Sequence, residues 1–188
     1  MQRPHFSRRG ALAGTAGLAS LVSGWPFARK SAYGQTPPGG QPSVLNIGLN
    51  VTDIERSIRF YVDALGFEDA GKVVSHPPNA ARVFFGTGGE AFLKAHHVRM
   101  GQLLLLLRQF DDPKYVGTTD GHPTHQIGMC NISVRVDSIG RVTALMREYG
   151  GSVFENTYVK RGTNEGNGGV GMIFGTDPDG IQIELVEF

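Results

Sequence analysis

The sequence predicts an α+β fold in which two repeated β-α-β-β-β modules form a cupped mixed sheet with the helices on the outside. The first observation behind this prediction is an internal repeat. A shift of 85 residues places Asn46-Ile47 on Asn131-Ile132, and near the C-terminal end of each copy a shift of 78 places residues 105–107 on 183–185. The second observation is that each copy begins and ends with alternating apolar and polar residues and has a helical pattern in between.

A helix is predicted at the same place in both copies. Asp53 and Ser138 are residue types that cap helix N-termini, and Gly66 and Gly150 end the two apolar runs. The apolar residues at helical spacing are Ile54, Ile58, Tyr61, Val62 and Leu65 in the first copy and Ile139, Val142, Leu145, Met146 and Tyr149 in the second. Less regular strands are predicted near residues 72–75, 82–85, 91–98, 153–158 and 171–174.

Residues 1–34 predict an export signal. They contain five basic residues and no acidic one, an Ala-, Gly- and Leu-rich stretch follows Arg8-Arg9, and the small residues around Tyr33 suit a signal peptidase. The Arg8-Arg9 pair resembles the twin-arginine type of signal, which implies a periplasmic or secreted protein. A flexible basic tail or a short uncleaved anchor is the alternative.

The rest of the chain predicts a linker and one domain. Residues 35–43 are rich in Pro and Gly and predict the linker, and the domain over 44–188 contains the two modules, at about 44–110 and 127–188. Without the five basic residues of the leader, 13 basic and 17 acidic side chains remain, a net charge of −4. This mildly acidic balance gives no reason to expect binding to nucleic acid, or to a membrane after signal removal. The single cysteine, Cys130, excludes an internal disulfide and is predicted to lie in the core.

Strand alternation separates a core face from a polar face. In the first and last strand of each copy, one set of alternate residues is aliphatic, Leu45 and Ile47 among them, and we expect the helices to cover it. The opposite set, which we expect to bind a ligand, is Asn46, Asn50, Arg108, Asn131, Ser133, Arg135, Gln182 and Glu184. If the sheets curl into a cup, this set lines a small-molecule cavity. The alternative is a solvated face of the kind that antiparallel sheets often have.

Two segments resemble the vicinal oxygen chelate superfamily. Residues 51–61 (VTDIERSIRFY), followed by Leu65-Gly66-Phe67, are similar to the opening of one of its modules, and residues 176–185 (TDPDGIQIEL) are similar to the close of its second module. The resemblance covers roughly residues 44–188 and implies paired β-α-β-β-β modules. The family includes glyoxalase lyases, methylmalonyl-CoA epimerases, extradiol dioxygenases, metal-dependent fosfomycin-modifying enzymes and metal-free bleomycin-binding proteins.

The resemblance also implies where a divalent metal would bind. Enzymes of the family usually hold the ion with histidines of the first strands and glutamates of the last strands. The corresponding positions here are Asn46, Asn131, Leu106 and Glu184. Only Glu184 among them is a normal ligand, so a divalent metal is disfavoured, no cofactor is expected and a dioxygenase is disfavoured. His96 and His97 would point to opposite faces of a strand, so only one of them could enter the cup.

Two functions follow from these observations. The first is an exported, glyoxalase-like lyase or isomerase in which Glu184 transfers a proton and Arg108 or Arg135 stabilises negative charge on the substrate. The second is a metal-free binding module that sequesters a small polar or anionic compound. Both predict a small molecule as the ligand, and a homodimer is compatible with either.

Overall fold

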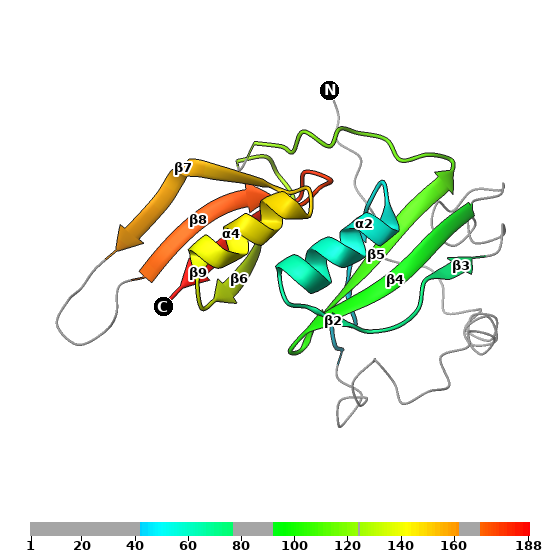
Figure 1. Cartoon of the computed structure of the whole chain (residues 1–188). Helices are drawn as coiled ribbons and strands as arrows, with labels where there is room; N and C mark the ends of the chain where they lie inside the picture. Colours follow the sequence, from blue (N-terminus) through cyan, green and yellow to red (C-terminus); the bar gives the residue numbers. More distant parts are fainter. Residues whose placement is uncertain (1–41, 77–91, 124, 162–169) are drawn as a thin grey trace, which may run out of the picture. The chain divides into compact units, whose positions relative to one another are not determined.

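The computed structural model describes residues 42–76, 92–123, 125–161 and 170–188, shown in colour in Figure 1. The chain divides into two units, Met1–Ser43 and Val44–Phe188, and the second is described here. The predicted export signal, all but two residues of the predicted linker, and the predicted strand at 82–85 lie outside the described residues.

The described strands form two mixed sheets, one in each module. The first sheet has the order β1-β5-β4-β2, with β3 also paired to β4, and the second has the order β6-β9-β8-β7. In each sheet the first strand of the module runs parallel to the last, β1 beside β5 and β6 beside β9, and the other pairs are antiparallel. The strands are β1 (Ile47–Asn50), β2 (Glu68–Asp69), β3 (Val74–His76), β4 (Phe92–Met100), β5 (Leu103–Asp112), β6 (Ile132–Val136), β7 (Ser152–Arg161), β8 (Val170–Thr176) and β9 (Gln182–Glu187).

Both predicted helices form where their caps indicated. Helix α2 (Ile54–Arg59) begins at Asp53, whose carboxylate accepts a hydrogen bond from the Arg56 amide at 3.0 Å, and it continues as one π-helical stretch, η2 (Phe60–Ala64). Helix α4 (Ile139–Glu148) begins at Ser138, whose hydroxyl oxygen accepts from the Arg141 amide at 3.3 Å. Gly66 and Gly150 follow the helices with φ of 81° and 88°, a conformation that disfavours residues with a side chain, so the predicted stops are confirmed.

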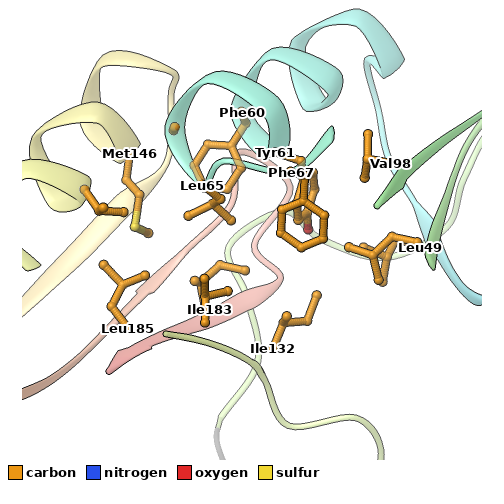
Figure 2. Close-up of a cluster of buried hydrophobic side chains, with 14 of the residues drawn as sticks. Leu49, Phe60, Tyr61, Leu65, Phe67, Val98, Ile132, Met146, Ile183 and Leu185 are labelled. Carbon is orange, nitrogen blue, oxygen red and sulfur yellow. The ribbon is translucent and has the colours of Figure 1, made fainter. Parts of the chain in front are cut away.

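One hydrophobic cluster holds both modules together. It joins the inner faces of α2, η2 and α4 to one face of each sheet, and Figure 2 shows Phe60 and Leu65 next to Met146, with Ile183 and Leu185 below them. Contact at this junction is close, because a Cβ atom on Gly151 would lie 2.6 Å from the Phe60 ring. Since both sheets bury one face in the same cluster, the opposite faces of both sheets lie on the side away from the helices.

A second, polar contact joins the modules through the turn between β8 and β9. The buried Asp177 carboxylate accepts hydrogen bonds from the Asp179 and Ile181 amides within the turn and, at 2.9 Å, from the Tyr61 hydroxyl of the first module. Asp179, whose side chain is 3% exposed, accepts from the amide and hydroxyl of Thr52 and forms an ion pair with Arg56 at 2.9 Å. This turn therefore connects the start of β9 to the start of α2.

The predicted fold class is confirmed by the two repeated modules, and two details of the predicted core are wrong. Leu45 and Ile47 are 59% and 36% exposed, because burial on this face of β1 begins only at Leu49. Cys130 is exposed rather than buried, because β6 begins at Ile132 and strand alternation does not extend back to residue 130. Among the residues that the structure describes, no helix is both long and apolar enough to cross a membrane.

Candidate functional site

The open face of the second module, the sheet face opposite the hydrophobic cluster, carries a hydrogen-bonded group of three predicted site residues. Parallel pairing of β6 and β9 sets Ser133 beside Glu184, and the Ser133 hydroxyl donates to Oε2 of that carboxylate. The Asn131 amide nitrogen donates to the same oxygen at 3.1 Å and to Ser133 Oγ at 2.9 Å. The two hydrogen bonds that described residues donate to the Glu184 carboxylate are both accepted by Oε2. Oε1 is therefore the oxygen that can contact a ligand.

The other predicted residues of this face lie at its two ends. Arg135 is exposed, and its guanidinium lies 4.9 Å from the centre of the Phe188 ring, in a cation–π contact. Gln182 begins β9 and lines an open cavity of about 540 Å³. The described walls of this cavity come from the segment between β5 and β6, which includes Cys130, and from the turn before β9.

The open face of the first module is built around Arg108. On β5 this residue pairs with Asn50 of β1 on one side and with Ala95 of β4 on the other. Its guanidinium lies over Gly48, since a Cβ atom at residue 48 would come within 2.6 Å of Arg108 Nη2. Burial lowers the pKa of Arg108, but a guanidinium remains charged at neutral pH. Asn46, the remaining predicted residue, is half-buried just before β1.

His97 is a site residue that the sequence analysis did not select. It pairs with Leu106, whose side chain packs on the open face, so His97 lies on that face as well. His96 lies on the opposite face, 3% exposed, with its Nε2 2.8 Å from Asp69. Burial, together with His96 and Arg99, lowers the pKa of His97, so its ring is neutral at pH 7. Alternation predicted that only one of the two histidines could lie on the open face, and the β4–β5 register shows that it is His97.

Comparison with known proteins identifies the family. Residues 43–185 match the profile of the Glyoxalase/Bleomycin resistance protein/Dioxygenase superfamily. The chain belongs to this superfamily. It is 27% identical over 146 residues to a probable lactoylglutathione lyase of Vibrio parahaemolyticus, a match that spans 77% of this chain and 89% of that protein.

Solved structures of the superfamily share the fold. A glyoxalase family protein from Bacillus cereus superposes with a TM-score of 0.64 at 17% identity, covering 78% of this chain and 96% of the other. The trypanothione-dependent glyoxalase I of Leishmania major gives a TM-score of 0.50 at 19% identity, covering 78% of this chain and 87% of the other. At these identities the likeness establishes the architecture and not the activity.

The residues at the superfamily's metal positions do not fit a divalent ion. Zn²⁺ and similar catalytic divalent ions are usually held by imidazole and carboxylate donors, whereas the positions here supply two neutral amides, the side chain of Leu106 and the single carboxylate of Glu184. In the described parts of the chain no three His, Cys, Asp or Glu side chains gather closely enough to hold a metal. The Glu184 carboxylate is held by Ser133 and Asn131 instead.

Proposed function

We propose that this superfamily member is an exported, glyoxalase-like lyase or isomerase that acts on a small molecule without a metal at the family's usual site. The observation that carries the proposal is the Glu184 carboxylate, which Asn131 and Ser133 hold by one oxygen on an open, polar face. A general base needs a fixed carboxylate with an oxygen that can face the substrate, and Oε1, which accepts no hydrogen bond from the residues that the structure describes, is suited to this role.

Proton transfer by Glu184 defines the proposed chemistry. Oε1 takes a proton from a carbon next to a substrate carbonyl and returns it to the neighbouring atom, so the carboxylate is regenerated at the end of each turnover. Negative charge that develops on the substrate oxygen is stabilised by Arg108, a half-buried cation whose field is screened less than that of a surface arginine. Arg135 has a weaker claim to this role because it is exposed and contacts Phe188.

The second candidate function is a metal-free module that binds a small polar or anionic compound without converting it. It is favoured by the poor fit of Asn46, Leu106 and Asn131 to a metal, because bound ions carry much of the chemistry of enzymes in this family. Asn131 and Ser133 would then serve as polar contacts for the captured compound, as would Gln182.

Substitution of Glu184 by Gln separates the two functions. The first test substrate is the hemithioacetal of glutathione and methylglyoxal, which is the isomer of lactoylglutathione, the compound in the name of the Vibrio relative. Gain of the thioester absorbance then reports turnover by proton transfer. For an enzyme we expect Glu184→Gln to lower kcat by about 10²- to 10⁴-fold, with KM changing little because the shape is kept. The control is Glu155→Gln, the same change at an exposed residue of β7 that pairs with Arg147.

Three results are informative. Turnover by the wild type and the Glu155 variant, together with loss in the Glu184 variant, supports proton transfer by Glu184. If the wild type binds lactoylglutathione but does not form it from the hemithioacetal, and Glu184→Gln changes only the affinity, the binding module is favoured. Equal turnover by all three proteins would show that Glu184 is not the base.

A further inference from the structure

We propose that the cavity beside the start of β9 binds the uncharged, largely apolar portion of the substrate, which is joined to the carbonyl carbon next to which Glu184 removes a proton. This assignment deepens the proposed function and rests on it for the role of Glu184. Binding of an uncharged compound in the cavity can itself be tested without any turnover.

The cavity has the size of a small-molecule site. Its volume is about 540 Å³, within the range of roughly 300–1,000 Å³ that such sites occupy. One wall is the turn before β9, and the other is the segment between β5 and β6. The described residues that line it are Gly117, Thr118, Gly121, His122, Pro123, Gln126, Ile127, Gly128, Met129, Cys130, Asp179, Gly180, Ile181 and Gln182.

Close backbone contact holds the two walls together. Gly180 of the turn has a φ of 83°, and a Cβ atom there would lie 2.5 Å from the Thr119 carbonyl oxygen and 2.6 Å from the Gly121 amide nitrogen. A residue with a side chain would therefore push the two segments apart. In the segment between β5 and β6, Thr118 Oγ1 donates to the Asp120 carboxylate at 2.9 Å and accepts from the Asp120 amide at 3.0 Å. The outer wall is thus a packed part of the fold.

The lining carries little charge. None of its described residues is a lysine, an arginine or a glutamate, and Asp179 is the one aspartate among them. The Asp179 carboxylate is held by the first module, since Oδ1 pairs with Arg56 at 2.9 Å and Oδ2 accepts from the Ser57 hydroxyl at 3.1 Å. The other ionisable residues of the lining, His122 and Cys130, are exposed. A charged group in the cavity would lose hydration without gaining an opposite charge, so an uncharged occupant is favoured.

Apolar side chains of the lining are exposed to water. Ile127 is 99% exposed and Met129 is 44% exposed, and Pro123 is exposed as well. A ligand that covers these side chains gains hydrophobic free energy, because apolar surface on both sides of the contact leaves water. The occupant that the cavity favours is therefore an alkyl or aromatic group.

The cavity adjoins the Glu184 carboxylate. Gln182 of the lining lies two residues before Glu184 on β9, so the two residues are on the same face of the strand and about 7 Å apart along it. Cys130 of the lining precedes Asn131, whose amide nitrogen donates to Glu184 Oε2 at 3.1 Å. A carbonyl compound whose apolar group fills the cavity can therefore place its next carbon beside this carboxylate, with any charged portion of the substrate outside the cavity.

The test uses Cys130, the single cysteine of the chain, as a reporter of occupancy. Alkylation of this exposed thiol by iodoacetamide in the full chain is followed by intact mass, with and without 2-hydroxyacetophenone, an uncharged ketone that carries a phenyl group. Hydroxyacetone, which has a methyl group in place of the ring, and benzoylformate, which keeps the ring but carries a carboxylate, are the controls. Alkylation in denaturing urea shows whether a compound acts on the reagent instead of on the folded protein.

We expect 2-hydroxyacetophenone to slow alkylation along a saturable curve, and hydroxyacetone and benzoylformate to bind at least tenfold more weakly. Met129→Ala should weaken binding of 2-hydroxyacetophenone about three- to tenfold, because it removes apolar surface from the lining. Val116→Ala should leave it unchanged, since Val116 is 97% exposed in the same segment and is not part of the lining. If circular dichroism shows that Met129→Ala is unfolded, Ile127→Ala takes its place.

Several results would overturn the cavity assignment. They are protection that does not saturate, equal protection by either control compound, and equal affinities for the Met129 and Val116 variants. A rate of alkylation that falls as the protein concentration rises, with no effect of 2-hydroxyacetophenone, would also overturn it and would assign the exposed apolar residues to a contact between two copies of the chain.

Hydrogen exchange in the same compound tells failure of the cavity from failure of the proposed function. The only C–H bonds next to the carbonyl of 2-hydroxyacetophenone are those of its CH₂OH carbon. In D₂O, Glu184 removes one of these protons, exchanges it with solvent and returns a deuteron. We expect the wild type to catalyse this exchange and Glu184→Gln to lose it, while 2-hydroxyacetophenone still protects Cys130. Protection without exchange in the wild type contradicts the role of Glu184 and supports the cavity, whereas exchange that depends on Glu184 without protection contradicts the cavity alone.

Discussion

Replacing Asp177 by Asn should change how the stability of the protein depends on pH. The Asp177 carboxylate is 2% exposed, and this burial raises its pKa from 3.8 to about 6. Hydrogen bonds from the Ile181 amide, the Tyr61 hydroxyl and the Asp179 amide act in the opposite direction and are outweighed. In an Asn variant the amide oxygen can still accept from the two backbone amides, and the amide nitrogen can donate to the Tyr61 oxygen, so the turn is kept without the charge.

The sign and the size of this change in stability follow from the pKa of Asp177 in the unfolded chain, 3.8, and its pKa in the folded protein, about 6. Because the folded state binds the proton more tightly than the unfolded chain, ionisation of Asp177 reduces the free energy of unfolding as the pH rises from about 4 to 6. A shift of about two units corresponds to about 3 kcal/mol, of which roughly 2 kcal/mol is lost between pH 4 and pH 7. The Asn variant does not lose this contribution. The difference in stability between the variant and the wild type should therefore move in favour of the variant by roughly 2 kcal/mol over this range.

Urea unfolding followed by circular dichroism at pH 4, 5, 6 and 7 measures this difference. The comparison of two proteins at each pH cancels the titrations that they share. Asp63→Asn, on the exposed side of η2, controls for the loss of one carboxylate. A difference that stays constant across the series, or that moves toward the wild type at pH 7, would refute the argument from burial. An equal change in the Asp63 control would show that burial of Asp177 is not the cause.

Three further predictions concern the packing, the metal and the N-terminus. Gly151→Ala should destabilise the protein by about 1–3 kcal/mol, because its Cβ would lie 2.5 Å from the Thr176 carbonyl oxygen and 2.6 Å from the Phe60 ring. The control is Gly140→Ala in α4, where nothing lies within 4 Å of the added Cβ. This control should be neutral or stabilising in the same urea assay. Elemental analysis after gentle purification should find well under one equivalent of Zn, Ni, Mn or Fe, and a stoichiometric ion bound by Glu184 would contradict the predicted loss of the metal site. Sequencing of protein from the producing cell should give a mature start near Gln35, whereas cytoplasmic protein that retains Met1 would refute export.

Local features of this protein were determined by the sequence alone. A cap depends on one side chain and the amide three residues later, which is why Asp53 and Ser138 could be recognised as helix starts. Gly66 and Gly150 could be recognised as stops, because a positive φ is a property of one residue. Strand alternation likewise assigned Glu184 to the face away from Ile183, and the repeat predicted that the second module follows the pattern of the first.

Tertiary structure decided everything that depends on how separate strands pair. Register between β4 and β5 brings His97 rather than His96 to the face of Arg108, and parallel register between β6 and β9 brings Ser133 to Glu184. Ile47 belongs to the aliphatic series of alternate residues in the first strand, yet it is exposed, because burial on this face of β1 begins only at Leu49. Alternation gives each side chain a face but not a neighbour, because pairing depends on hydrogen bonds between residues that lie far apart in the sequence.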